Sequence, residues 1–235
     1  MCGRIVQSGG ALQLSIVEGL GPPDDRVVAL PPRYNGAPSQ DLLVIRENHQ
    51  TGRRSIDALR WGLIPHRCND PSGGRRPINA KAETVASLPT FRDAYARRRC
   101  LVPVNGFYEW KTTKFGKQPY AVAMANGEPF ALGGIWENWW SQRTGQWMRT
   151  FCILTTTANA LVSHIHDRMP LILSADSYGR WLGKEADPAD LRRVHVPTDM
   201  ATWPISNRVN SPKNDDAEVF AGIDTPLRGE AIQSR

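Results

Sequence analysis

Residues 120–135 read YAVAMANGEPFALGGI, with Asn126-Gly127 between two apolar runs of strand length. Asn-Gly is a preferred pair at two-residue hairpin turns, because both central positions adopt positive φ. The two runs, 120–124 and 130–135, contain the β-branched and aromatic residues that are typical of strands. We therefore expect these runs to pair as a hairpin in an antiparallel sheet.

The apolar runs on either side extend this β-rich pattern along the chain. A second turn is expected at Phe115-Gly116-Lys117. Helical patterns are fewer and shorter, and they interrupt the strands without the strand-helix-strand rhythm of a parallel sheet. Further strands are expected at residues 3–7, 42–46, 100–104 and 150–155, and helices at 12–20, 84–96, 158–165, 175–182 and 188–193. The sequence predicts an α+β fold of mainly antiparallel β-sheets with flanking short helices.

Length and continuity favour a single domain over residues 1–235. A chain of 235 residues can bury one sizeable core, and no linker separates two hydrophobic halves. The polar tail from about Arg228 is expected to be disordered. Nothing in the pattern indicates an obligate dimer, so we expect a monomer.

Charge and hydropathy predict a soluble protein with a polyanionic partner. The net charge is +6, and arginines cluster at several points, including Arg97-Arg98-Arg99. Guanidinium groups bind phosphates, and the eight tryptophans could stack on exposed bases. The alternative is that these clusters form a solvated helix face or loop. No run approaches the roughly 18 apolar residues that span a bilayer, and no signal peptide is evident. We expect a cytoplasmic location without membrane contact.

Residue 2 carries the most distinctive chemistry. The chain opens Met1-Cys2-Gly3-Arg4, so removal of Met1 would make Cys2 the N-terminus. Its α-amine could then form a Schiff base with an aldehyde, and its thiol could add to that imine and close a thiazolidine ring. A cysteine at position 2 is also tolerated as an ordinary small residue, so position alone leaves both interpretations open.

The four cysteines give no indication of a metal site or a disulfide. Cys2, Cys68, Cys100 and Cys152 are widely spaced, and none forms a Cys-x-x-Cys pair. We expect free thiols, with Cys100 and Cys152 in the core, and neither a metal nor another cofactor.

Three polar residues interrupt apolar or aromatic segments. Asn79 precedes the expected helix at 84–96, and Glu109 lies among aromatics in Gly106-Phe107-Tyr108-Glu109-Trp110-Lys111. A carboxylate in such surroundings should have a raised pKa, although an edge-strand pair with Lys111 is an alternative. His166 follows a short helix before Pro170 and is suited to moving protons, although a lone histidine is more often structural.

These segments belong to a set of short motifs that occur in order along nearly the whole chain. They are Met1-Cys2-Gly3-Arg4, Arg33-Tyr34-Asn35-Gly36-Ala37-Pro38, Trp61-Gly62-Leu63-Ile64-Pro65, Ile78-Asn79-Ala80-Lys81-Ala82-Glu83-Thr84, Gly106-Phe107-Tyr108-Glu109-Trp110-Lys111, His166-Asp167-Arg168-Met169-Pro170 and Val209-Asn210-Ser211-Pro212-Lys213-Asn214-Asp215. Together they resemble the SOS-response-associated peptidase (SRAP) family, and the number of spaced motifs makes the resemblance specific. It implies a barrel-like core.

The resemblance also implies a reaction. Cys2, after removal of Met1, would capture the ring-opened aldehyde of an abasic site in single-stranded DNA as a thiazolidine crosslink. Asn79 would orient the sugar, Glu109 would transfer protons and act on the Cys2 amine, and His166 would assist ring opening and crosslink reversal. The protein would associate with the nucleoid when bound to DNA.

Further positions match the family near DNA. Arg4, Lys81 and Arg168 correspond to positions close to phosphates. Trp61 and Pro65 are candidates for a wedge or stacking surface, with a place in the core as the alternative. The family often has a further tryptophan after the Trp61 motif, where this chain has His66-Arg67-Cys68.

Three functions follow from these residues. The leading one is an abasic-site shield, to which lyase activity through the same Schiff base can be added. Removal of Met1 is either autoproteolytic, as the family name suggests, or the work of a host aminopeptidase. The second is an N-terminal-cysteine peptidase or amidohydrolase, in which the thiol attacks a carbonyl. The third is a basic single-strand-binding module in which Cys2 has no chemical role.

Overall fold

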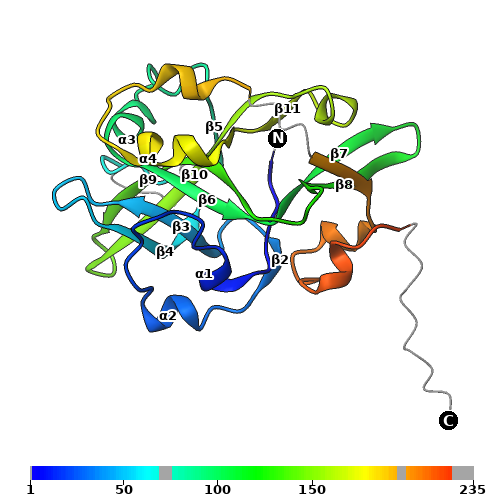
Figure 1. The fold of residues 1–235 in the computed structure, drawn as a ribbon, viewed down its shortest axis with the longest axis horizontal. Helices are drawn as coiled ribbons and strands as arrows, with labels where there is room; N and C mark the ends of the chain where they lie inside the picture. Colours follow the sequence, from blue (N-terminus) through cyan, green and yellow to red (C-terminus); the bar gives the residue numbers. More distant parts are fainter. Residues whose placement is uncertain (1, 69–75, 195–199, 224–235) are drawn as a thin grey trace, which may run out of the picture.

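The computed structural model describes residues 2–68, 76–194 and 200–223, and these form two β-sheets with short helices around them (Figure 1). Met1, whose removal the chemistry of Cys2 requires, lies outside the described residues, as does the tail expected to be disordered from about Arg228. The first sheet is antiparallel throughout. Its strands, in spatial order, are β13 (Met200–Pro204), β8 (Gly116–Met124), β7 (Gly106–Thr113), β1 (Ile5–Gln7) and β2 (Arg33–Gly36).

Within the described residues, five strands of the second sheet close into a barrel. The ring runs through β3 (Asp41–Glu47), β4 (Arg54–Trp61), β10 (Gln146–Thr157), β9 (Phe130–Ser141) and β6 (Arg99–Val104), which pairs again with β3. Three short strands are added to it, β5 (Asn79–Lys81), β11 (Arg168–Pro170) and β12 (Ile172–Leu173). The barrel-like, mainly antiparallel core is confirmed, although β10 pairs in parallel with β4 and β5.

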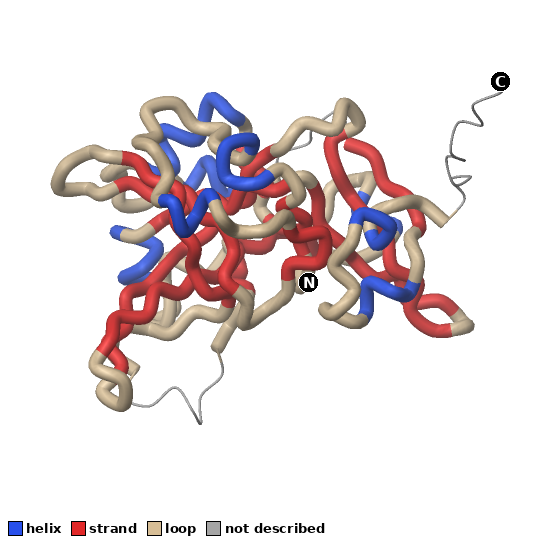
Figure 2. The backbone as a smooth tube through the Cα atoms, turned by 90° about the horizontal axis from the view of Figure 1, so that it is seen from below, coloured by secondary structure: helices blue, strands red, loops and turns tan. Residues whose placement is uncertain are grey.

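The helices are short and lie at the periphery (Figure 2). The α-helices are α1 (Gly10–Gln13), α2 (Asp25–Val28), α3 (Arg92–Arg97) and α4 (Tyr178–Leu182), and single 3-10 turns lie at Val162–His164, Ala175–Ser177, Ala189–Arg192, Asn207–Asn210 and Ala217–Val219. The helix expected at 84–96 is limited to α3, because Pro89 cannot continue a helix that starts before it. None of the helices in the described parts of the chain is both long and apolar enough to span a bilayer.

The hairpin predicted at Asn126-Gly127 is wrong. The turn exists, since Gly127 has φ +76° and its N–H donates to the Met124 carbonyl at 3.0 Å. The strands on either side nevertheless belong to different sheets, because the chain leaves β8 and enters the barrel at β9. The turn predicted around Phe115 is confirmed, with Thr113 of β7 directly opposite Gly116 of β8.

The core between the sheet and the barrel holds the chain start. Cys2 packs there with Ile5 and Phe107 from the first sheet and Val44 and Trp61 from the barrel. Cys100 lies in the same cluster, and Cys152 lies in the cluster on the outer face of the barrel. The core positions of Cys100 and Cys152 are confirmed, and Cys2, for which burial was not expected, is fully buried as well. All three thiols are free, and Cys68 is half-buried and free.

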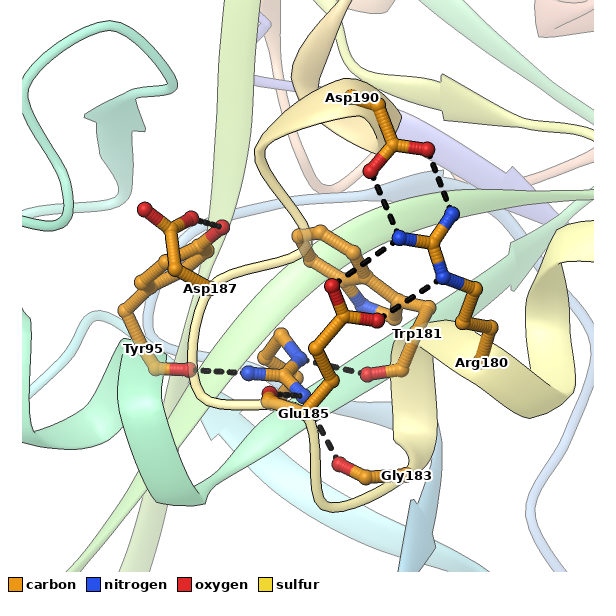
Figure 3. Close-up of polar contacts among 8 residues, drawn as sticks. Tyr95, Arg180, Trp181, Gly183, Glu185, Asp187 and Asp190 are labelled. Carbon is orange, nitrogen blue, oxygen red and sulfur yellow. Dashed lines mark hydrogen bonds and ion pairs between the residues drawn. The ribbon is translucent and has the colours of Figure 1, made fainter.

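A buried arginine fastens the α3 and α4 segments to the barrel. Arg99 is 1% exposed and donates to the carbonyl oxygens of four residues, Tyr95, Trp181, Gly183 and Glu185. In the same cluster, Arg180 bridges Glu185 and Asp190 at the surface (Figure 3).

Replacing Arg99 with methionine should destabilise the fold strongly. Four carbonyls would lose a buried donor, which is expected to lower the free energy of unfolding by about 3 kcal/mol or more. Arg180→Met is the matched control, and its effect should be small because the pairs it makes are exposed. Urea unfolding of both variants measures the difference, and equal midpoints would contradict the structural role given to Arg99.

Candidate functional site

The site is built around Cys2, immediately before β1. Its side chain is 0% exposed, and its backbone carbonyl accepts a hydrogen bond from Asn79 Nδ2 at 2.7 Å. Burial raises the pKa of the Cys2 thiol, and the negative charge of Glu109 raises it further. The thiol is therefore neutral at physiological pH in this state and needs a base to take its proton.

Glu109 is the nearest candidate for that base. It lies on β7, between β1 and β8, and is 1% exposed. Burial raises its pKa to about 7, so both protonation states are populated at neutral pH. The alternative of an edge-strand pair with Lys111 is wrong, because β7 is an interior strand and Lys111 is exposed.

Asn79 links the two parts of the fold at this point. Its strand β5 pairs with β10, with Asn79 opposite Ile153, and its amide nitrogen holds the Cys2 carbonyl. Its Oδ1 is buried and has no hydrogen-bond partner among the described residues. That oxygen can accept a hydrogen bond from a hydroxyl group placed beside Cys2. Lys81, two residues further along β5, is exposed and lies on the same face of the strand.

His166 is held as a neutral imidazole. The backbone N–H of Arg168 lies 3.0 Å from His166 Nδ1, and the Asp167 carboxylate faces the same nitrogen, so these two neighbours favour opposite tautomers of the neutral ring. Burial is the main cause that lowers the pKa of His166, and Asp167, with Oδ1 2.8 Å from Nδ1, opposes the shift. The ring can accept a second proton during a reaction and release it afterwards.

The two arginines of the expected phosphate-binding set are already engaged with protein groups. Arg168 makes a bidentate ion pair with Glu83 at 2.8 and 2.9 Å and also donates to the Thr155 carbonyl. Arg4 Nη2 donates to the Asn210 carbonyl at 3.2 Å. Contact of Arg168 with a phosphate stays a prediction and requires the phosphate to compete with Glu83.

Trp61 is a core residue, which corrects the expectation of a stacking surface there. It is 1% exposed, its Nε1 donates to the Ile78 carbonyl at 2.8 Å, and its ring stacks on Phe151 with centroids 6.1 Å apart. A base cannot reach a ring buried in this way. Pro65 is half-buried and lines a cleft of about 330 Å³ with His66 and Arg67, so its place in a DNA contact stays a prediction.

The C-terminal motif has a positioning role that the sequence did not reveal. Asn35 Nδ2 donates to the carbonyls of Val209, Ser211 and Asn214, and Asp215 accepts from the Asn35 backbone N–H. This network fixes Asn210, whose side chain accepts from Trp110 Nε1 and whose carbonyl accepts from Arg4. The motif was recognised in the sequence, but the residues that it binds lie 100 or more positions away.

Together, these residues place two groups that can transfer protons and an amide acceptor around a buried cysteine at the chain start. The two groups differ in protonation state before the reaction. Glu109 is partly protonated near neutral pH, whereas His166 is a neutral base. Within the residues that the structure describes, no three His, Cys, Asp or Glu side chains cluster in a way that could hold a metal ion. The arrangement suits acid-base chemistry at a carbonyl carbon or a sugar.

Comparisons with known proteins agree with the fold and the motifs. The model of the SOS response associated peptidase (SRAP) family matches residues 1–212. Abasic site processing protein YoaM of Bacillus subtilis (strain 168) is 39% identical over 194 residues, which are 80% of this chain and 84% of that protein. Abasic site processing protein YedK of Escherichia coli (strain K12) is 29% identical over 95% of this chain and its own full length. A crystal structure of a protein from Bacteroides thetaiotaomicron is 26% identical, covers 94% of this chain and 99% of that one, and has a TM-score of 0.83. The resemblance found in the sequence is confirmed, and the chain belongs to the SRAP family.

Proposed function

We propose that this protein captures abasic sites in single-stranded DNA through a covalent bond to Cys2. The observation that carries the proposal is the placement of Cys2. Its carbonyl accepts a hydrogen bond from Asn79, and its thiol is close enough to feel the charge of Glu109, whose pKa is about 7. The names of the relatives, abasic site processing proteins, support the same substrate. The net charge of +6 favours binding of a polyanion.

The reaction consists of two bond-forming steps. After Met1 is removed, the Cys2 α-amine attacks the aldehyde of the ring-opened sugar, and loss of one water gives an imine. The thiol sulfur then adds to the imine carbon, the thiol proton leaves to a base, and the imine nitrogen gains a proton. The product is a thiazolidine, and its formation from aldehyde and aminothiol releases one water in total.

Glu109 supplies the proton transfer that the buried thiol requires. Because burial keeps the thiol neutral, sulfur becomes a strong nucleophile only as its proton is removed. The Glu109 carboxylate accepts that proton, and its pKa of about 7 allows it to return the proton to nitrogen.

Asn79 and His166 act on the sugar. The unpartnered Oδ1 of Asn79 accepts a hydrogen bond from a sugar hydroxyl next to the reacting carbon. The neutral His166 takes the proton of the anomeric hydroxyl as the bond from the anomeric carbon to the ring oxygen breaks, and it delivers that proton to the ring oxygen, which gives the aldehyde. Ring closure on reversal runs the same transfers backwards. Arg4, Lys81 and Arg168 provide the positive charge for the flanking phosphates.

Two further activities follow from the same groups. The imine intermediate permits strand cleavage by β-elimination, which is a lyase reaction. The Cys2 thiol could also attack a peptide carbonyl, as the family name suggests, with Glu109 as the base. The neutral state of the thiol makes the peptidase role dependent on Glu109, whereas the lyase role needs only the amine.

A denaturing gel tests the proposal with DNA controls. Purified protein mixed with a single-stranded oligonucleotide that carries one abasic site should give an adduct that survives denaturation. The same oligonucleotide after borohydride reduction has lost its aldehyde and should give none. An equal adduct yield with the reduced or undamaged oligonucleotide would overturn the proposal. Failure to form any adduct with the abasic oligonucleotide would also overturn it, once mass spectrometry has verified that Met1 is absent.

A further inference from the structure

The hairpin between β7 and β8 forms a basic arm with an aromatic tip. The arm comprises residues 111–118, and residues 111–117 are exposed. It carries Lys111, Lys114 and Lys117, and the sequence has no Asp or Glu between Trp110 and Gly127. Phe115, at the tip, is 89% exposed. A large apolar ring so exposed among lysines is suited to a partner that offers both negative charge and flat apolar surfaces.

The tip is ordered by local contacts. The Thr113 hydroxyl donates to the Gly116 carbonyl at 2.8 Å and accepts from the Phe115 backbone N–H at 3.2 Å. Gly116 has φ +118°, which an L side chain rarely adopts. The Lys114 ammonium lies 4.9 Å from the Phe115 ring centroid and covers one face of the ring. The ring is therefore held on a rigid turn, and its high exposure leaves surface for stacking.

The arm is continuous with the candidate active site. Glu109 lies on the strand that leads into the arm, and the four residue steps from Glu109 to Thr113 span about 13 Å of extended chain. Lys117 also lies close enough to His166 to contribute to the lowering of its pKa, of which burial is the main cause. A nucleic acid strand bound at Cys2 would meet the arm within about four nucleotides at the spacing of duplex DNA.

A pair of exposed tryptophans elsewhere on the surface is a weaker candidate for stacking on DNA bound at Cys2. Trp140 and Trp147 lie on the β9–β10 hairpin and pack edge to face, with centroids 5.2 Å apart. In Figure 1 this hairpin lies at the lower left, while the β7–β8 arm projects to the upper right.

We propose that Phe115 stacks on an unpaired base of the DNA strand within about four nucleotides of the abasic site, while the arm lysines bind the neighbouring phosphates. This inference rests on the proposed function. Exposed bases stack on aromatic side chains irrespective of sequence, and lysines at the same surface neutralise the backbone. Phe115 would thus provide the stacking surface that Trp61, buried in the core, cannot provide.

The test measures binding without the covalent step. Single-stranded DNA with a tetrahydrofuran analogue at the lesion has no aldehyde, so fluorescence anisotropy reports the noncovalent Kd. Phe115→Ala should raise Kd about 5- to 150-fold, the range for loss of one stacked base. Phe115→Trp should restore binding. Trp147→Ala is the control, because it removes another exposed aromatic ring, 62% exposed. It should leave Kd within twofold of the wild type.

A scan of the DNA identifies the stacked base. Each of the four nucleotides on either side of the analogue is replaced in turn by a base-free spacer. At one position the spacer should weaken binding of the wild type but not of Phe115→Ala, which is the signature of a direct pair. A Kd for Phe115→Ala within twofold of wild type, or spacer effects identical in both proteins, would overturn the inference.

The outcome separates this inference from the proposed function. If the wild type binds the analogue but forms no adduct with a true abasic site, the crosslinking proposal fails and the stacking result stands alone. If the wild type forms the adduct and Phe115→Ala binds equally well, only the stacking inference fails. Absence of any binding of the analogue by the wild type would refute the stacking inference, and the adduct assay alone would then decide the crosslinking proposal.

Discussion

Cys2→Ala will abolish the stable adduct with abasic DNA, reducing its yield by at least about 100-fold, because the ring closure needs a thiol held beside the amine. The variant keeps an α-amine after Met1 removal, so it can still form an imine. Borohydride added during the reaction should therefore trap an adduct that is absent without the reductant. The measurement is a denaturing gel with and without borohydride.

Cys100→Ala is the matched control for this variant. Cys100 is also fully buried, lies in the same hydrophobic cluster and has a raised pKa because of burial. Both substitutions remove one buried sulfur, and a similar small loss of stability is expected from each. Only Cys2→Ala should lose the adduct. Equal loss in both variants would mean that packing of the core, and not the chemistry of residue 2, limits the reaction.

Glu109→Gln will slow thiazolidine formation by about 100-fold or more, the usual effect of removing a positioned base. In the wild type, the rate should rise with pH as the Glu109 carboxyl ionises near pH 7 and as the Cys2 amine loses its proton near pH 8. Glutamine cannot ionise, so the first rise should disappear and the second should persist. Single-turnover rates between pH 5.5 and 9 provide the comparison, and an unchanged rate and profile would remove Glu109 from the mechanism.

The same substitution should stabilise the folded protein at alkaline pH. The pKa of Glu109 is raised by folding, so the folded state binds this proton more tightly than the unfolded state between about pH 4.3 and 7. The stability that the proton supplies is complete below pH 4.3 and is lost as pH rises through 7. Above pH 7 the loss reaches about 4 kcal/mol at most. Glu109→Gln avoids this loss, so its unfolding midpoint should exceed that of the wild type at pH 8.

The strands could be predicted from local sequence more reliably than their partners. Every run expected to be a strand is one, because apolar and β-branched residues favour extended chain wherever it is buried. Pairing depends on tertiary context. Asn126-Gly127 makes its turn, but the chain after it continues into a different sheet. The Gly145 turn between β9 and β10 was not anticipated, although those strands form a long antiparallel pair.

The site illustrates the same division. Glu109 could be recognised as a carboxyl group among aromatics, but the local pattern left an edge-strand pair with Lys111 open, and the interior place of β7 in the sheet decides for burial and a raised pKa. The hydrogen bond from Asn79 to Cys2 joins residues 77 positions apart and depends on how β5 pairs with β10. Trp61 in a motif gave no sign of whether it faced the core or the solvent. The contact of Arg168 with Glu83 likewise follows only from the folded chain.

The most direct measurement of the central claim is the mass of the adduct and its position in the chain. The adduct formed by wild-type protein and a short abasic oligonucleotide should have the mass of the chain without Met1, plus the DNA, minus one water. Peptide sequencing should place the modification on residue 2, and the Cys2 thiol should resist alkylation. An adduct that retains Met1, or one that maps to a lysine such as Lys81, would contradict the account.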